Sequence, residues 1–217
     1  MRLIVIFLIL KFSSNMYSQT DSNEIKIINK DSGYYEILNV SKTNNTLKNG
    51  LYQKYFNTKI GISGQYSMNS KVGIWKYYDW DGKEYLKFDY TNNQIVSFIS
   101  DTIRRKIILK KDTIIGHVDR PALYFGSRME VDNFVRHHMN YPNTALEKYI
   151  EGKVIIGIVI NDKGIAENYY LARGVEQSLN KEALRVVMDF KGKWIPAIYN
   201  GKTVKSVYFQ AVYFTLQ

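Results

Sequence analysis

The sequence predicts an α+β protein in which a β-rich first part precedes a mixed C-terminal domain. Glycines followed by alternating aromatic residues recur between residues 48 and 98, whereas helix-type spacing of apolar residues appears only after Lys111. A near-continuous β-branched run then extends from Lys153 to Ile160. A period of two is typical of strands, and apolar residues three or four positions apart indicate an amphipathic helix. The 217 residues suffice for two small domains or one large one.

The first residues have the pattern of an export signal. Arg2 precedes an apolar run at residues 3–10, and Lys11 follows it. The run is too short for a transmembrane helix, which needs about 20 apolar residues, but it suits the apolar centre of a signal peptide. We therefore expect a signal peptide at residues 1–19 and no transmembrane segment in the mature chain. The alternatives are an uncleaved N-terminal anchor in the inner membrane and a buried strand.

Residues 20–98 are predicted to be β-rich, most clearly at residues 48–98. The segment 50–56 recurs at 73–78, each time as a glycine followed by aromatic residues in alternation. Aromatic residues at every second position share one face of a strand, and such units bury that face by stacking. The stretch resembles MORN-type repeats, with their acidic glycine turn at residues 79–83. Residues 34–46 are a candidate for a third, degenerate unit.

Residues 99–118 are predicted to be a linker or a short strand with solvated flanks. Here a basic run at residues 104–106 and a second basic pair, Lys110 and Lys111, enclose three apolar residues. The formal charge of the whole chain is +10, but the basic residues are spread along it and no nucleic-acid-binding motif accompanies them. We therefore expect no nucleic-acid partner.

Residues 119–217 are predicted to form a domain with a three-stranded antiparallel sheet and two helices. Apolar residues between Val131 and His138 follow helical spacing, and the helix should end at Tyr141-Pro142 because the residue before proline avoids the helical region. A short helix is an option at residues 145–150. The β-branched strand from Lys153 is followed by a hairpin turn at residues 161–164.

The remaining elements complete the order helix, strand, strand, helix, strand. Asn180 can cap the second helix, whose apolar face runs from Leu179 to Phe190. The last strand extends from Val204 to Leu216. We expect Phe190 and Trp194 to belong to the core of this small domain.

This order and the motifs within it resemble the C-terminal domain of TonB-family proteins, of the kind found in Bacteroidetes energy transducers. The motifs are Tyr141-Pro142, residues 151–154, residues 161–164, residues 179–184 and residues 194–202. Each motif is weak alone, and their order and spacing over residues 119–217 carry the resemblance.

The resemblance implies a periplasmic protein-binding module. Its expected partner is a TonB-dependent outer-membrane transporter or a related envelope protein, bound as an added strand in transport across the outer membrane. Family members also transmit force from an inner-membrane motor through an anchor and a proline-rich spacer. Three prolines are too few for such a spacer. A homodimer is a further option for the partner.

The last strand is the expected binding edge. In a small sheet an outer strand has unpaired backbone groups, which attract another extended chain, and the resemblance points to this strand and to the segment before the first sheet strand. The candidate partner-binding residues are Asn140, Tyr141, Pro142, Val204, Ser206, Val207, Tyr208, Phe209, Gln210 and Val212. The alternative is that the repeat region or a second copy of the chain covers this edge.

No enzyme, cofactor or metal site is predicted. The chain has no cysteine, its serines lie in no nucleophile-elbow motif, and its glycines lack phosphate-loop spacing. The adjacent His137 and His138 do not have the spacing of two helical metal ligands. Residues 79–82 lack the later ligands of a calcium loop and are predicted to be a turn. The alternative to a binding module is a structural scaffold that uses its repeats as the main interaction surface.

Overall fold

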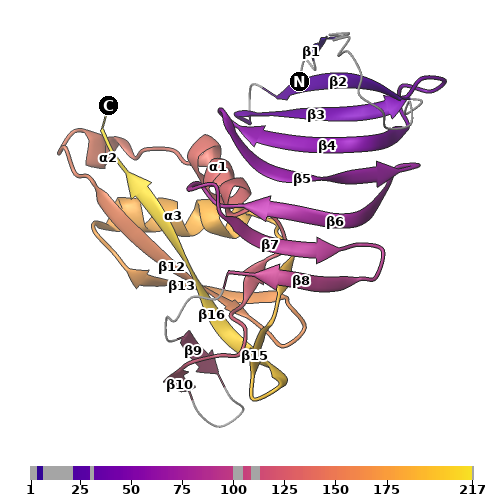
Figure 1. Cartoon of the computed structure of the whole chain (residues 1–217). Coiled ribbons are helices and arrows are strands. Elements are labelled where there is room, and N and C mark those ends of the chain that lie inside the picture. The colour runs from indigo at the N-terminus through magenta and orange to yellow at the C-terminus, as the bar shows by residue number, and fades with distance from the viewer. Residues whose placement is uncertain (1–3, 7–21, 30–31, 100–104, 109–112, 217) are drawn as a thin grey trace. The chain divides into compact units, whose positions relative to one another are not determined.

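The computed structural model describes residues 4–6, 22–29, 32–99, 105–108 and 113–216 (Figure 1). The chain divides into two compact units, Met1–Ile99 with Gly126–Asn133, and Ser100–Phe125 with Phe134–Gln217. The division falls within helix α1 (Arg128–His138). Of the predicted signal peptide only strand β1 (Ile4–Ile6) is described, and the rest lies outside the described residues.

The first unit contains an eight-stranded antiparallel sheet in which each strand pairs with the next along the chain (Figure 1). Its strands after β1 are β2 (Ser22–Asn29), β3 (Tyr34–Ser41), β4 (Lys48–Phe56), β5 (Lys59–Ser67), β6 (Ser70–Tyr78), β7 (Glu84–Asp89) and β8 (Gln94–Phe98). The sheet therefore begins well before the repeat pattern becomes clear in the sequence.

Aromatic residues of the repeats form the buried face of this sheet. Trp75 is 1% exposed, and its ring lies so close to Gly64 that an added Cβ there would meet a ring carbon at 2.3 Å. Tyr52 and Tyr66 pack against the same indole at ring-centre distances of 5.3 Å and 5.1 Å. Residue 64 must be glycine because a side chain would displace the buried tryptophan.

The acidic segment at the start of β7 is a turn in the structure. Gly82 has a φ of 80° and donates its N–H to the Asp79 carbonyl at 2.9 Å. The Asp79 carboxylate accepts a hydrogen bond from Arg128 at 3.0 Å, and the Asp81 carboxylate pairs with Lys83 at 2.9 Å. Both carboxylates are thus engaged by cations of the chain itself.

The second unit is built on a sheet with the order β10-β9-β16-β12-β13, to which β15 adds by pairing with β16. Its strands are β9 (Arg105–Ile108), β10 (Thr113–Gly116), β12 (Gly152–Ile160), β13 (Ala166–Arg173), β15 (Ala197–Tyr199) and β16 (Lys202–Phe214), while β11 (Leu123–Tyr124) pairs with β14 (Trp194–Ile195). The helices of the C-terminal part are α1, α2 (Asn143–Leu146) and α3 (Gln177–Asp189). No helix within the described ranges is long and apolar enough to cross a membrane.

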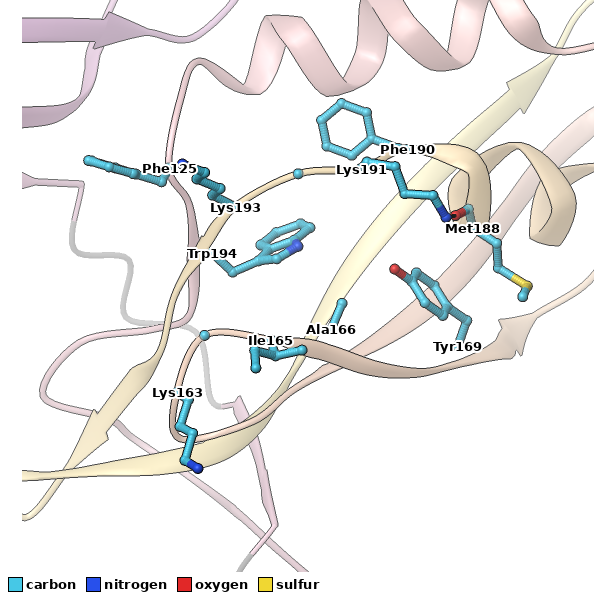
Figure 2. Close-up of a pocket in the computed structure, with 12 residues that line it drawn as sticks. Phe125, Lys163, Ile165, Ala166, Tyr169, Met188, Phe190, Lys191, Lys193 and Trp194 are labelled. Carbon is cyan, nitrogen blue, oxygen red and sulfur yellow. Dashed lines mark hydrogen bonds between the residues drawn. The ribbon is translucent and has the colours of Figure 1, made fainter.

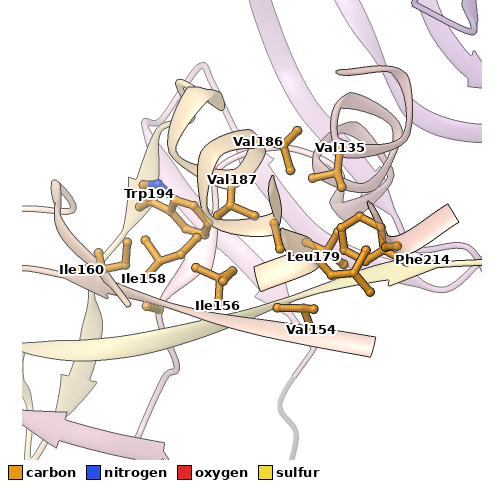
Figure 3. Close-up of a cluster of buried hydrophobic side chains, with 14 of the residues drawn as sticks. Val135, Val154, Ile156, Ile158, Ile160, Leu179, Val186, Val187, Trp194 and Phe214 are labelled. Carbon is orange, nitrogen blue, oxygen red and sulfur yellow. The ribbon is translucent and has the colours of Figure 1, made fainter. Parts of the chain in front are cut away.

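The core of the second unit lies between α3 and one face of this sheet (Figure 3). Val154, Ile156, Ile158 and Ile160 of β12 all point to this face and are at most 1% exposed. The even-numbered residues of β12 therefore form one apolar stripe, as the period of a strand requires. Side chains of α3, β14 and β16 complete the core: Leu179, Ala183, Val186, Val187, Trp194, Val212 and Phe214.

Two sequence predictions about this unit are wrong. The sheet has six strands instead of three, because β9 and β10 join it from the predicted linker and β15 pairs with β16. The cap of α3 is Glu176 and not Asn180: the Glu176 carboxylate accepts the N–H groups of Ser178 and Leu179. The Asn180 side chain instead accepts the N–H of Val175 at 2.9 Å.

Candidate functional site

The binding edge predicted from the sequence belongs to β16, the long strand drawn in yellow in Figure 1. Its neighbour on one side is β12, which it pairs with from Gly152↔Phe214 to Ile160↔Ser206 without a register shift. An unbroken register fixes which residues of β16 bond to β12 and which face away from it.

The hairpin between β12 and β13 gives this orientation. Asn161 donates its N–H to the Ile165 carbonyl at 2.9 Å, and its own carbonyl accepts the N–H of Gly164 at 3.1 Å. The backbone groups of Asn161 thus face β13, so the even-numbered residues of β12 face β16. Their partners in β16, such as Gln210 opposite Ile156, are also even-numbered. The N–H and C=O groups of the odd-numbered residues of β16 therefore face away from β12.

On that far side, the described part of the chain covers the beginning of β16. Strand β9 pairs with Lys205 and Ser206. Beyond Ser206, none of the residues that the structure describes pairs with β16 on this side. The prediction of a free edge along the whole strand is thus wrong for its first part, which a hairpin from the predicted linker covers. The outward backbone groups of Phe209, Ala211 and Tyr213 remain unpaired with any described strand.

One side chain already occupies part of this edge. Gln210 donates its side-chain amide to the Ala211 carbonyl at 2.9 Å. A carbonyl that faces β12 would already accept a hydrogen bond from β12. The bond from Gln210 therefore agrees with the outward direction of the Ala211 carbonyl. An incoming strand would compete with the Gln210 amide for the same acceptor.

The side chains of most candidate residues on β16 are not accessible. Ser206, Val207, Gln210 and Val212 are buried, Val204 and Tyr208 are half-buried, and only Phe209 is exposed, at 44%. The sequence prediction did not include Tyr213, which is 59% exposed and lies on the same face as Phe209. Strand parity alone could have identified it. The Lys153 ammonium lies 5.2 Å from the centre of the Tyr213 ring.

The structure places the Asn140–Tyr141–Pro142 segment at the C-terminal end of β16. The Tyr141 ring packs edge-on against Phe214 at 5.5 Å, and its hydroxyl donates to the Ile150 carbonyl at 2.7 Å. Asn140 donates its backbone N–H to Glu182 of α3 at 2.7 Å. Tyr141 thus lies against the last residue of β16, whereas the candidate residues of the strand itself extend from Val204 to Val212.

Glu182 holds this segment through charge. Burial raises the pKa of the Glu182 carboxyl, but hydrogen bonds from Arg185 and from the Asn140 N–H outweigh burial, so the pKa lies below its ordinary value. Arg185 also donates to the His138 carbonyl at 2.8 Å. The end of α1, the Asn140 segment and α3 are therefore joined by one ionic network.

A cavity of about 660 Å³ lies elsewhere in the second unit, between the β12–β13 turn and the end of α3 (Figure 2). Trp194, Tyr169, Phe190 and Met188 are among its lining residues. No sequence motif indicates this cavity, because its walls come from segments distant along the chain. Trp194, 8% exposed, belongs to the core as predicted, whereas Phe190 is half-buried.

The second unit is thus an α+β domain in which part of one edge of β16 is unpaired among the described residues. The family model described as Gram-negative bacterial TonB protein C-terminal matches residues 137–216. The match covers α2, α3 and strands β12 to β16, which supports a TonB-like C-terminal domain in this part of the chain. It does not extend to the repeat region, whose resemblance to MORN-type repeats remains a prediction. No curated protein matches the chain. No solved structure matches it.

Proposed function

We propose that this chain is an exported envelope protein whose C-terminal domain binds an extended segment of an outer-membrane transporter or a related envelope protein by strand addition. The observation that carries the proposal is the orientation of β16, whose odd-numbered residues from Phe209 to Tyr213 direct their backbone groups away from β12. The family match to residues 137–216 supports the envelope setting.

The partner would bind mainly through its main chain. An added strand would exchange N–H···O=C bonds with Phe209, Ala211 and Tyr213, and these bonds carry little information about the partner's sequence. Selectivity would come from the exposed rings of Phe209 and Tyr213, which flank the position opposite Ala211. These rings favour apolar or aromatic residues at alternate positions of the partner.

The outward orientation allows a matched proline experiment on β16. Proline at Ala211 removes an N–H that faces the partner, whereas proline at Gln210 removes an N–H that bonds to β12. We expect Ala211→Pro to remain folded and to lose binding of synthetic peptides from the N-terminal segments of the host's outer-membrane transporters. Gln210→Pro should instead lower the melting temperature strongly. Fluorescence anisotropy of labelled peptides and thermal melting measure the two effects.

Phe209→Pro repeats the experiment at a second outward position. If folded Ala211→Pro and Phe209→Pro variants both bind the peptides with native affinity, strand addition at this edge is wrong. If a transporter binds the full chain but none of its N-terminal peptides does, the chain recognises another part of the transporter.

The scaffold alternative depends on the large sheet of the first unit. Leu51 and Ile74 are 42% and 50% exposed and lie on the face opposite Tyr52 and Trp75. Lysine at both positions should leave transporter binding unchanged if β16 is the binding edge. Loss of binding in this double variant, with an unchanged melting temperature, would favour the scaffold.

A further inference from the structure

The cavity in the second unit has the character of a small-molecule site. Its volume, about 660 Å³, lies within the range of roughly 300–1,000 Å³ that is common for ligand pockets. It is formed by the β12–β13 turn, the start of β13, the end of α3 and the segment that follows α3 (Figure 2). Its walls thus come from elements that the core of the domain already fixes.

One side of the cavity is apolar and aromatic. Trp194 is held in place by ring contacts with Tyr208 at 4.8 Å and with Tyr124 at 5.7 Å. Phe190 packs against Tyr124 and Phe134, each at 5.3 Å. Because these contacts hold both rings in place, the rings of Trp194 and Phe190 form a preorganised surface for an apolar ligand. Met188, 44% exposed at the end of α3, extends this surface toward solvent.

The polar groups of the cavity are donors and cations. Tyr169 projects from β13 toward the indole of Trp194 in Figure 2, and no residue within the described ranges forms a hydrogen bond with its hydroxyl. Burial raises the pKa of this phenol, so the hydroxyl keeps its proton and can donate it. Lys191 lies at the rim, and its ammonium donates to the Met188 carbonyl at 3.0 Å. Lys193 also lines the cavity, but Figure 2 shows it beside Phe125, on the opposite side of Trp194 from Tyr169.

The lining of the cavity carries positive charge: among the described residues that line it, none is acidic. A third lysine, Lys163, also lines the cavity, although Figure 2 shows its amine directed away from Trp194 and Tyr169. An anionic group at the rim would therefore meet cations, while a neutral group would gain nothing from them.

We propose that this cavity binds a small amphipathic anion, with its apolar body against Trp194 and Phe190 and its carboxylate beside Tyr169 and Lys191. The carboxylate accepts a hydrogen bond from the Tyr169 hydroxyl and is neutralised by the Lys191 ammonium. The site is separate from the strand-binding edge of β16, because no residue of β16 lines the cavity. A protein of this kind would bind a soluble ligand independently of its macromolecular partner.

Decanoate and its neutral analogue decanamide test the proposal on the purified full chain. Isothermal titration calorimetry gives the affinity, and the NMR signal of the Trp194 indole N–H reports on the site. We expect decanoate to bind saturably with a shift of this signal, and decanamide to bind roughly tenfold more weakly, since a charge-assisted hydrogen bond contributes about that factor. Equal affinity for the two compounds, or no shift of the Trp194 signal, would overturn the proposal.

Matched variants locate the charge. Lys191→Met should weaken decanoate binding roughly tenfold while leaving decanamide unaffected. Lys181→Met and Lys202→Met are the controls, because both lysines are exposed in the same unit and neither lines the cavity. Tyr169→Phe removes only the hydroxyl and should weaken decanoate selectively. The same loss in the controls would show a general charge effect and exclude this site.

Discussion

At the scale of single residues, Gly164 shows how a short motif is fixed by its surroundings. Its φ is 77°, and an added Cβ would lie 2.3 Å from the Trp194 carbonyl oxygen. The turn between β12 and β13 therefore requires glycine at residue 164 for two reasons. The backbone conformation favours glycine, and the close contact with the segment after α3 leaves no room for a Cβ. The sequence predicted the hairpin turn, but the contact depends on the tertiary fold.

Gly164→Ala and Gly201→Ala separate these two requirements. Gly201 has a φ of 71°, but an added Cβ would meet nothing within 4 Å. Gly201→Ala should cost about 1–2 kcal/mol from the left-handed conformation alone, and Gly164→Ala should cost clearly more because the backbone must also move. Urea denaturation measures both changes. Equal losses would show that the neighbouring chain adjusts freely to the new Cβ.

Trp194 and Phe190 were both predicted to be core residues, and the structure separates them. Trp194 is 8% exposed within the core cluster, whereas Phe190 is half-buried beside it. Trp194→Ala should cost about 3–5 kcal/mol of unfolding free energy, as expected for a buried aromatic residue, and Phe190→Ala should cost less. A Trp194→Ala variant with native stability would show that the indole is a ligand surface and not part of the core.

Glu182 gives the domain a predictable dependence on pH. Its pKa lies below the ordinary value in the folded state because Arg185 and the Asn140 N–H bind the carboxylate. This stabilisation is present above the unfolded pKa of about 4.3 and is lost as the pH falls through the folded value. Glu182→Gln should therefore lower the melting temperature at pH 7, and the difference from the native chain should vanish toward pH 2. A difference that is constant with pH would mean that charge is not the cause.

At the scale of elements, the sequence predicted the long periodic segments well. The β-branched run became β12, the alternating last segment became β16, and the apolar spacing between Leu179 and Val187 became the buried face of α3. The predicted start of α3 is wrong because Asn180 and Glu176 both offer a capping side chain. Which of the two caps the helix depends on local geometry. Glu176 lies in an extended conformation before the helix, where its carboxylate reaches the free N–H groups.

The short strands could not be predicted in the same way. Strands β9 and β10 have four residues each, too few for a reliable period, and basic residues surround them. Their place in the sheet follows from pairing with β16, which is far away in the sequence. The extent of the open edge depends on this pairing, and so the candidate site could be predicted only in outline.

Ile107 tests whether this hairpin is a structural part of the second unit. Its side chain is fully buried, whereas Ile115 of β10 is 67% exposed. Ile107→Ala should cost about 2–4 kcal/mol of unfolding free energy, and Ile115→Ala should change it little. If both variants unfold at the native urea concentration, residues 99–118 behave as the linker that the sequence predicted.

At the scale of the whole molecule, the sheet of the first unit extends beyond the strands that carry clear repeats. Strand β2 has no glycine–aromatic motif and β3 lies in the degenerate candidate unit, yet the two strands pair in full register with each other and β3 continues onto β4. A sheet grows by backbone pairing, so strands with ordinary sequences extend it once neighbours supply an edge. The motif identifies the central strands, where Gly64 and Trp75 pack closely, but does not define the ends of the sheet.

The N-terminus offers a last prediction about the whole chain. If residues 1–19 are a signal peptide, the exported protein loses β1, which pairs with β2 only over Ile4–Ile6. Strand β2 would remain paired with β3 along its eight residues, so the sheet should persist with β2 as its edge. We expect N-terminal sequencing of the protein from the host envelope to begin near Gln19 or Thr20. A chain that starts at Gln19 should melt at the same temperature as the full chain. Recovery of an intact Met1 from the membrane pellet would contradict cleavage and support the anchored alternative, in which the same domain could transmit force from the inner membrane.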